Sequence, residues 1–155
     1  MSIVFAGTPE NAAKTLEALI EAGTEVTLVV TRPDAPVGRK AVITASPVAQ
    51  VAEKFGIRTL KSKSFDVETV AQIVVGGYKL GIVVAYGGLL KIDALSATEL
   101  GWFNVHYSDL PKWRGASPVQ SAILAGDTET AVSIFKLEEG LDSGPILLKV
   151  RTKIE

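Results

Sequence analysis

The sequence predicts an α/β fold in which a mainly parallel sheet is covered by helices on both faces. Its 155 residues suffice for one compact domain, and 47% of them are hydrophobic, which is enough to fill a core. Short apolar runs without polar alternation, typical of strands buried on both faces, are separated by amphipathic helical segments. No linker divides the chain, so we expect a single domain over residues 1–155.

The first half of the chain predicts three strands and two helices. We expect Thr8 to cap the first helix and Pro9 to be its first residue, and we expect that helix to end at Gly23. The pair Ser46-Pro47 repeats the capping signature, and Gly56 ends the second helix. The expected strands are residues 3–6, 26–30 and 57–60.

The second half continues the same rhythm. We expect Asp66 to cap a third helix that closes at Gly76-Gly77, and Ser117-Pro118 to open another that stops at Gly126. Apolar and charged residues still alternate up to Ile154 with no closing helix, which predicts a domain truncated at its C-terminal end. The remaining expected strands are residues 80–85, 103–106, 132–137 and 146–150.

The composition excludes several classes of function. Without cysteine, the chain forms no disulfide, thiolate metal site or cysteine nucleophile, and its single histidine, His106, excludes multi-histidine metal sites. The net charge of −1 creates no general attraction for nucleic acid, so such contacts require a local patch. We find no basic leader and no apolar run of the roughly 20 residues that a membrane span needs. We therefore expect a cytoplasmic monomer that binds neither metal nor membrane.

Four segments are expected at the carboxyl ends of the strands, where open α/β sheets bind ligands. The first contains neither the glycine fingerprint of dinucleotide sites nor a phosphate-binding lysine motif. Between the second strand and Ser46, residues 32–45 form the longest expected loop, a kind of segment that is often functional. The four segments are Gly7–Pro9, Ala85–Gly88, His106–Gly115 and Leu137–Gly144.

Two of these segments contain the residues that favour catalysis. Asn104 and His106 lie two residues apart on an expected strand, so their side chains project from the same face. Asp142 either belongs to a solvated acidic turn or returns to the sheet and orients His106, whose charged form a carboxylate stabilises. Such a trio suits acyl transfer to an amine, which needs donors for a tetrahedral oxyanion and an acceptor for the amine proton. The alternative to a catalytic role is that all three are structural polar residues.

Several motifs together resemble the folate-dependent formyltransferases, and among them the methionyl-tRNA formyltransferases. The similarity runs from Ile3 to about Val150. The motifs are Phe5–Glu10, Thr31–Asp34 with Gly38-Arg39, Ser46–Val48, Val84–Gly87, Asn104–His106, Leu110–Gly115 and Leu141–Gly144.

This resemblance implies a Rossmann-like formyltransferase fold, 10-formyltetrahydrofolate as donor, and methionyl initiator tRNA as acceptor in translation initiation. It places Asn104 and protonated His106 at the oxyanion, with Asp142 holding His106 and helping to remove the amine proton. It also implies that Arg39 and Lys40, in the long loop, approach the tRNA. The implied folate contacts are Ser108, Asp109, Leu110 and Pro111, with backbone groups around Gly88, Leu90, Leu137, Glu138 and Gly140.

Three departures from the family pattern stand out. The long loop is poorer in lysine than is usual in the family, since Lys40 is followed by Ala41-Val42-Ile43. Asp109 occupies a position where the family usually has leucine, which puts a charge beside the expected folate site. The C-terminal tRNA-binding barrel of the family is absent from the sequence.

Other functions remain open from the residues alone. The trio is equally compatible with a folate-dependent formyltransferase or hydrolase whose acceptor is a sugar nucleotide, glycinamide ribonucleotide or water. A module that binds folate or nucleotide without catalysis is the third possibility.

Overall fold

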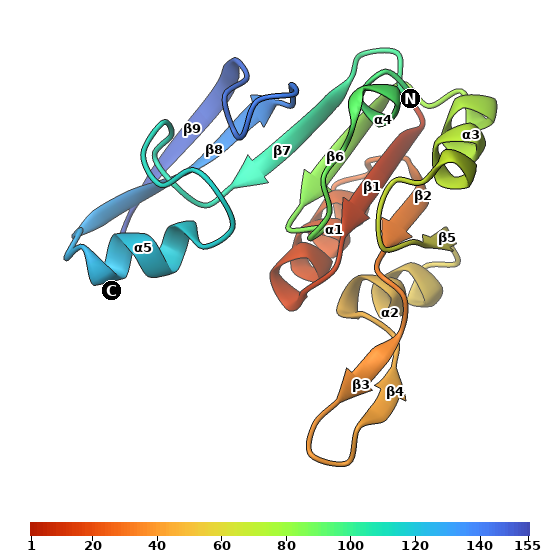
Figure 1. The fold of residues 1–155 in the computed structure, drawn as a ribbon, viewed down its shortest axis with the longest axis horizontal. Coiled ribbons are helices and arrows are strands. Elements are labelled where there is room, and N and C mark those ends of the chain that lie inside the picture. Colours follow the sequence, from red (N-terminus) through yellow and green to blue (C-terminus); the bar gives the residue numbers. More distant parts are fainter.

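A twisted sheet of seven strands forms the centre of the molecule in the computed structural model, which describes residues 1–155 (Figure 1). The strand order is β5-β2-β1-β6-β7-β8-β9. The first five of these strands run parallel to one another, and β8 is antiparallel to both of its neighbours. The bounds are β1 (Ile3–Gly7), β2 (Val26–Thr31), β5 (Arg58–Lys61), β6 (Leu80–Val84), β7 (Trp102–His106), β8 (Glu129–Lys136) and β9 (Ile146–Lys153).

Helices cover the parallel part of the sheet on both faces, as the apolar strands predict. Helices α1 (Glu10–Glu21) and α2 (Pro47–Lys54) pack on one face, and α3 (Val67–Gly76) and α4 (Ile92–Leu95) on the other. Val4 and Phe5 are adjacent on β1, belong to opposite core clusters and are both fully buried. The predicted α/β class is therefore confirmed. The short helix α5 (Pro118–Leu124) lies beside the antiparallel strands (Figure 1).

Two of the three predicted helix caps, Ser46 and Asp66, are confirmed. The Ala49 amide donates to the Ser46 hydroxyl at 3.0 Å, and the Thr69 amide donates to the Asp66 carboxylate at 2.8 Å. The Ser46 hydroxyl also shares a buried hydrogen bond of 2.6 Å with the Thr31 hydroxyl, which ties the start of α2 to the end of β2.

The third cap was wrongly predicted. Thr8 does not cap α1, because its hydroxyl donates to the Tyr86 carbonyl at 2.8 Å and so joins the ends of β1 and β6. Pro9 precedes α1 as the N-cap and makes no side-chain capping bond. Ser117-Pro118 opens α5 as predicted, with Ser117 at the N-cap position, although its side chain makes no capping bond.

The segment expected as the longest loop, residues 32–45, contains a β-hairpin instead. Strand β3 (Ala35–Val37) pairs antiparallel with β4 (Val42–Thr44), and the hairpin projects away from the main sheet (Figure 1). Its turn closes through the Ala41 amide, which donates to the Gly38 carbonyl at 3.1 Å. A proline is tolerated here because each strand has one partner only, so Pro36 removes no central ladder bond.

The direction of β8 corrects a second expectation. Because His106 is paired with Ser133 and Phe103 with Lys136, β8 ends beside the start of β7. The segment Leu137–Gly144 therefore leaves the sheet at the amino ends of the parallel strands, and not at their carboxyl ends as expected. Strands β8 and β9 are also longer than predicted, and every residue of β9 is exposed. No helix is long and apolar enough to span a membrane.

We predict that Ser46→Ala lowers the free energy of unfolding by about 2 kcal/mol, since it removes the cap of α2 and leaves the buried Thr31 hydroxyl without its partner. Urea titration followed by circular dichroism measures this loss. Ser117→Ala is the matched control, because Ser117 makes no capping bond, and it should change stability by less than about 0.5 kcal/mol. Equal losses in the two variants would contradict the assigned cap.

Candidate active site

A cleft of about 860 Å³ opens at the carboxyl ends of β6 and β7. Nineteen residues line it, of which nine are hydrophobic, and they come from five parts of the chain. These parts are the start of α1, the segment after β6, the end of β7, the start of α5 and the loop before β9. The cleft has the size and mixed lining that are usual for small-molecule sites.

Asn104 and His106 line the cleft from β7, as the two-residue spacing predicts. They alternate with Val105, which packs with the core on the α1–α2 side, so their side chains belong to the other face of the sheet, together with Trp102. The His106 side chain is only 7% exposed. The side-chain amide of Asn104 makes no hydrogen bond within the chain, which leaves it available to a ligand.

Asp142 reaches the same place by a different route. The Leu137 amide donates to the Trp102 carbonyl at 2.8 Å, so the loop after β8 starts at the amino end of β7. It returns toward the carboxyl end, where Asp142 Oδ2 lies 3.9 Å from His106 Nδ1. The three residues predicted as catalytic thus lie in one cleft, although the loop that carries Asp142 starts at the opposite end of the strands from the one predicted.

The loop that carries Asp142 needs a glycine near its end. A Cβ at Gly144 would overlap the carbonyl oxygen of Lys136, where β8 and β9 meet. A side chain at this position would force the backbone away from β8, so Gly144 allows the tight approach that brings Asp142 back to β7.

The segment Trp113–Gly115, which we call the strap, contacts both His106 and Asp142. Nε2 of His106 lies 2.9 Å from the Trp113 carbonyl oxygen, and the Gly115 amide donates to Asp142 Oδ2 at 2.7 Å. A carbonyl only accepts hydrogen bonds, so His106 carries a proton on Nε2. The other ring nitrogen, Nδ1, therefore faces the Asp142 carboxylate.

The predicted folate contacts are divided between the cleft and the interior. Gly88 lines the cleft, whereas Ser108, Leu110 and Leu90 are buried. The Ser108 hydroxyl donates to the Lys112 carbonyl at 2.5 Å, which fixes the loop after β7. The remaining predicted contacts, namely Asp109, Pro111, Leu137, Glu138 and Gly140, do not line the cleft.

Asp109 is paired with cations of β9 instead of facing the cleft. Its carboxylate accepts from Lys149 Nζ at 2.7 Å, and Arg151 lies 3.4 Å away. The hydrogen bond from Lys149, with the charges of Lys149 and Arg151, holds the pKa of Asp109 below its usual value of 3.8. The charge that departs from the family pattern thus ties the loop after β7 to β9.

The two residues predicted to contact tRNA lie away from the cleft. Arg39 and Lys40 are exposed in the turn of the β3–β4 hairpin, between Gly38 and Ala41. Neither forms an ion pair with another part of the chain, so both cations are available to an external partner.

Sequence reasoning missed several features in and around the cleft. Ala85 and Trp113 adopt the left-handed region with φ of 45° and 58°, and no motif predicts this. Arg32 donates to the Gly87 carbonyl at 2.8 Å and so supports the segment after β6. The start of α5 contributes Pro118, Val119 and Gln120, which the Ser117-Pro118 signature together with the preceding loop could have indicated.

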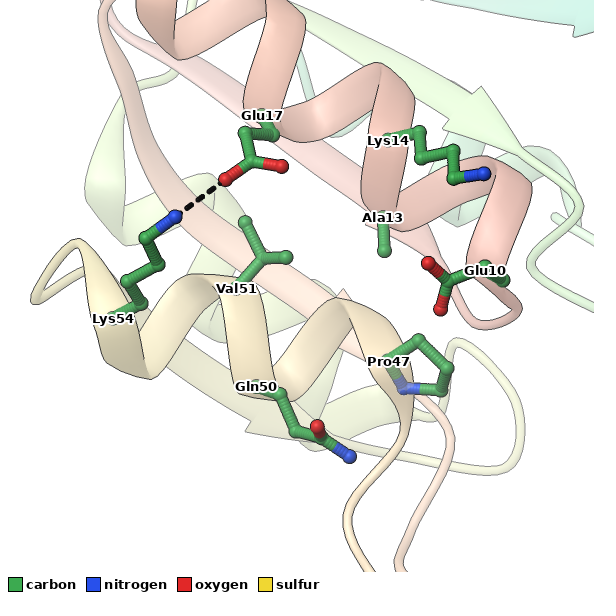
Figure 2. Close-up of a pocket in the computed structure, with 8 residues that line it drawn as sticks. All are labelled: Glu10, Ala13, Lys14, Glu17, Pro47, Gln50, Val51 and Lys54. Carbon is green, nitrogen blue, oxygen red and sulfur yellow. Dashed lines mark hydrogen bonds and ion pairs between the residues drawn. The ribbon is translucent and has the colours of Figure 1, made fainter.

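A second, smaller concavity lies between α1 and α2 (Figure 2). It measures about 370 Å³ and is mainly polar, and an ion pair of 2.6 Å between Lys54 and Glu17 crosses it. None of the predicted site residues lies there. No group of three or more histidine, aspartate or glutamate side chains is placed to hold a metal ion.

Comparisons with known proteins give consistent results. The family model described as formyl transferase matches residues 1–155. The chain is 52% identical over 146 residues to the methionyl-tRNA formyltransferase of Clavibacter sepedonicus, covering 94% of this chain and 48% of that protein. It is 53% identical over 156 residues to that of Streptomyces avermitilis, covering 99% and 50%. The chain therefore spans about half the length of the curated relatives it matches.

Solved structures share the fold at lower identity. Phosphoribosylglycinamide formyltransferase from Bacillus halodurans matches with a TM-score of 0.82 and 22% identity, over 100% of this chain and 81% of that one. An N-formyltransferase from Helicobacter canadensis, solved with folinic acid and dTDP-3-aminofucose, matches with a TM-score of 0.67 and 20% identity, over 98% and 52%.

We predict that the Asp109–Lys149 pair makes stability fall in acid. Because the folded pKa of Asp109 is lowered, the unfolded chain binds more protons as the pH drops below about 4, and the stabilisation is lost as the pH falls through the folded pKa. Urea unfolding between pH 6 and pH 2.5 measures this slope. Asp109→Asn and Lys149→Met should both reduce the steepness of the acid loss. A slope identical to that of the parent chain in both variants would contradict the assignment.

Proposed function

Because the chain belongs to the formyl transferase family, we propose that it transfers the formyl group of 10-formyltetrahydrofolate to the amino group of methionyl initiator tRNA. Residues 1–155 would form the catalytic domain of this enzyme of translation initiation. The observation that carries the proposal is the meeting of Asn104, His106 and Asp142 in one cleft, in a chain about half identical to methionyl-tRNA formyltransferases.

The reaction forms a bond between the methionyl nitrogen and the formyl carbon, and breaks the bond from that carbon to N10 of the folate. Between these events the formyl oxygen carries a negative charge, which positioned donors stabilise. The Asn104 amide is free to donate to this oxygen. The second donor is protonated Nδ1 of His106, since Nε2 is occupied by the Trp113 carbonyl.

Asp142 supports this chemistry from beside the imidazole. Its carboxylate stabilises the positive charge of His106 across 3.9 Å and accepts the proton that the attacking amine must lose. N10 of the departing tetrahydrofolate finally takes up that proton. The amide of Gly115 orients the carboxylate and keeps it beside the ring.

The cleft fits the donor in size and character. Its volume of about 860 Å³ lies within the range of sites for drug-sized ligands, and the apolar part of its lining suits a flat pterin ring. Gly88 is the predicted folate contact that reaches this surface. Ser108, Leu110 and Leu90 would act indirectly, because they are buried and do not line the cleft.

The β3–β4 hairpin is the proposed contact for the acceptor. Arg39 and Lys40 extend from its turn into solvent, where they can neutralise phosphates of an acceptor stem. The hairpin leaves the sheet after β2, and Arg32 at its base contacts the cleft segment through Gly87. A nucleic acid held by the hairpin would thus be connected to the cleft through the Arg32 side chain and Gly87.

We predict that His106→Ala, Asp142→Ala and Asn104→Ala each lower the kcat of formyl transfer by about 100-fold or more, with little change in the urea midpoint. The assay follows labelled formyl from 10-formyltetrahydrofolate to methionyl initiator tRNA. Glu139→Gln, an exposed change on the same loop as Asp142, is the matched control and should retain activity. Full turnover in the three variants would refute the proposed chemistry. Transfer to a sugar nucleotide, glycinamide ribonucleotide or water instead would refute the acceptor.

We predict that Arg39→Ala weakens tRNA binding. The negative slope of log affinity against log salt should become less steep by about one, as expected for one lost phosphate contact. Folate affinity should not change, because Arg39 does not line the cleft. Fluorescence anisotropy with labelled tRNA at several salt concentrations measures both affinity and slope. Lys153→Ala removes an exposed cation at the end of β9 and is the control for net charge. Equal effects from the two variants would argue against the hairpin contact.

A further inference from the structure

Asp127, which follows α5, holds the loop after β7 through two side chains. Both of its carboxylate oxygens accept from Lys112 Nζ at 2.7 Å, and one also accepts from the indole Nε1 of Trp113 at 2.8 Å. Its own backbone is fixed, since the Asp127 amide donates to the Ala122 carbonyl within α5. The carboxylate is therefore a stationary acceptor for two neighbouring residues.

Trp113 needs such support because of its backbone. Its φ of 58° is in the left-handed region, which is unfavourable for a bulky residue. The carbonyl of this strained residue is the group that lies 2.9 Å from His106 Nε2. A continuous path thus runs from the Asp127 carboxylate through the indole and backbone of Trp113 to the imidazole.

We propose that Asp127 is a positioning residue that sets the tautomer of His106 by holding Trp113, so that Nε2 carries the proton and Nδ1 faces Asp142. Its bearing on catalysis rests on the proposed function, whereas the tautomer itself does not. Asp127 touches neither the cleft nor the three proposed catalytic residues.

The electrostatics of Asp127 support this role. Hydrogen bonds from Lys112 and Trp113 hold its pKa below the usual value of 3.8, so the group is ionised at neutral pH and acts only as an acceptor. Lys112 also lies 5.2 Å from the centre of the Trp113 ring. The lysine is 55% exposed, however, and an exposed ion pair contributes little, so we assign the positioning to the bond between Asp127 and the indole.

The single histidine of the chain allows a direct test, because each imidazole nitrogen gives one unambiguous ¹⁵N signal. In the parent chain, above the pH at which the ring is protonated, Nε2 should give the signal of a protonated nitrogen and Nδ1 that of an unprotonated one. Asp127→Ala and Trp113→Phe each remove the same bond, and both should shift the signals toward a mixture of tautomers. The double variant should show no further shift.

Two variants separate positioning from charge. Asp127→Asn keeps an oxygen that can accept from the indole, and should preserve the tautomer. Lys112→Met removes the ion pair but leaves the bond between Asp127 and Trp113, and should also preserve it. Parent-like signals in both Asp127→Ala and Trp113→Phe would overturn the inference, as would a shift in Lys112→Met as large as that in Asp127→Ala.

The kinetic measurement then relates positioning to the reaction. Asp127→Ala should lower kcat on the order of tenfold with little change in KM for either substrate, and Asp127→Asn should restore most of it. If the chain transfers no formyl group at all, the proposed function fails while the ¹⁵N result still decides the role of Asp127. A changed tautomer with unchanged kcat would overturn the link to catalysis.

Discussion

The position of β7 in the sheet is the constraint on which the site depends. It is the one strand with a parallel neighbour, β6, on one side and an antiparallel neighbour, β8, on the other. The parallel side presents the carboxyl ends of β6 and β7 together and so forms the edge of the cleft. The antiparallel side sends the chain to the far end of the sheet, and the loop that returns from there brings Asp142 to His106. Two strand directions thus place the carboxylate beside the imidazole.

Backbone strain is concentrated where this convergence occurs. Of the four residues other than glycine with positive φ, Ala85, Trp113 and Asp142 belong to the cleft or to the strap, and Ala41 belongs to the turn of the hairpin. Each costs roughly 1–2 kcal/mol, a cost that surrounding contacts must offset. Trp113 and Asp142 are held by hydrogen bonds with His106 and Gly115. The strained backbone of Trp113 and Asp142 is therefore connected by hydrogen bonds to the orientation of the His106 ring and the Asp142 carboxylate.

Local patterns predicted the parts of the fold that local physics controls. Buried apolar strands, glycine stops and the caps of Ser46 and Asp66 depend on a few neighbouring residues, and these were confirmed. Thr8 was wrongly predicted because a distant acceptor, the Tyr86 carbonyl, competes for its hydroxyl. The hairpin was missed because Pro36 and Gly38 are residue types typical of loops and because its two strands are short. The partner of Asp109 could not be predicted either, since Lys149 is distant in sequence and adjacent only after β9 pairs with β8.

The proposed catalytic residues and the proposed acceptor contact lie on separate parts of this architecture. Asn104, His106 and Asp142 depend on β7 and the loop before β9, whereas Arg39 and Lys40 depend on a hairpin inserted after β2. Chains about one fifth identical to this one share its fold, with TM-scores of 0.82 and 0.67. A sheet that forms through strand pairing tolerates changes at its periphery, because the hairpin contributes neither a strand to the sheet nor a residue to the cleft. A change in the hairpin therefore leaves the strand pairing around β7 intact.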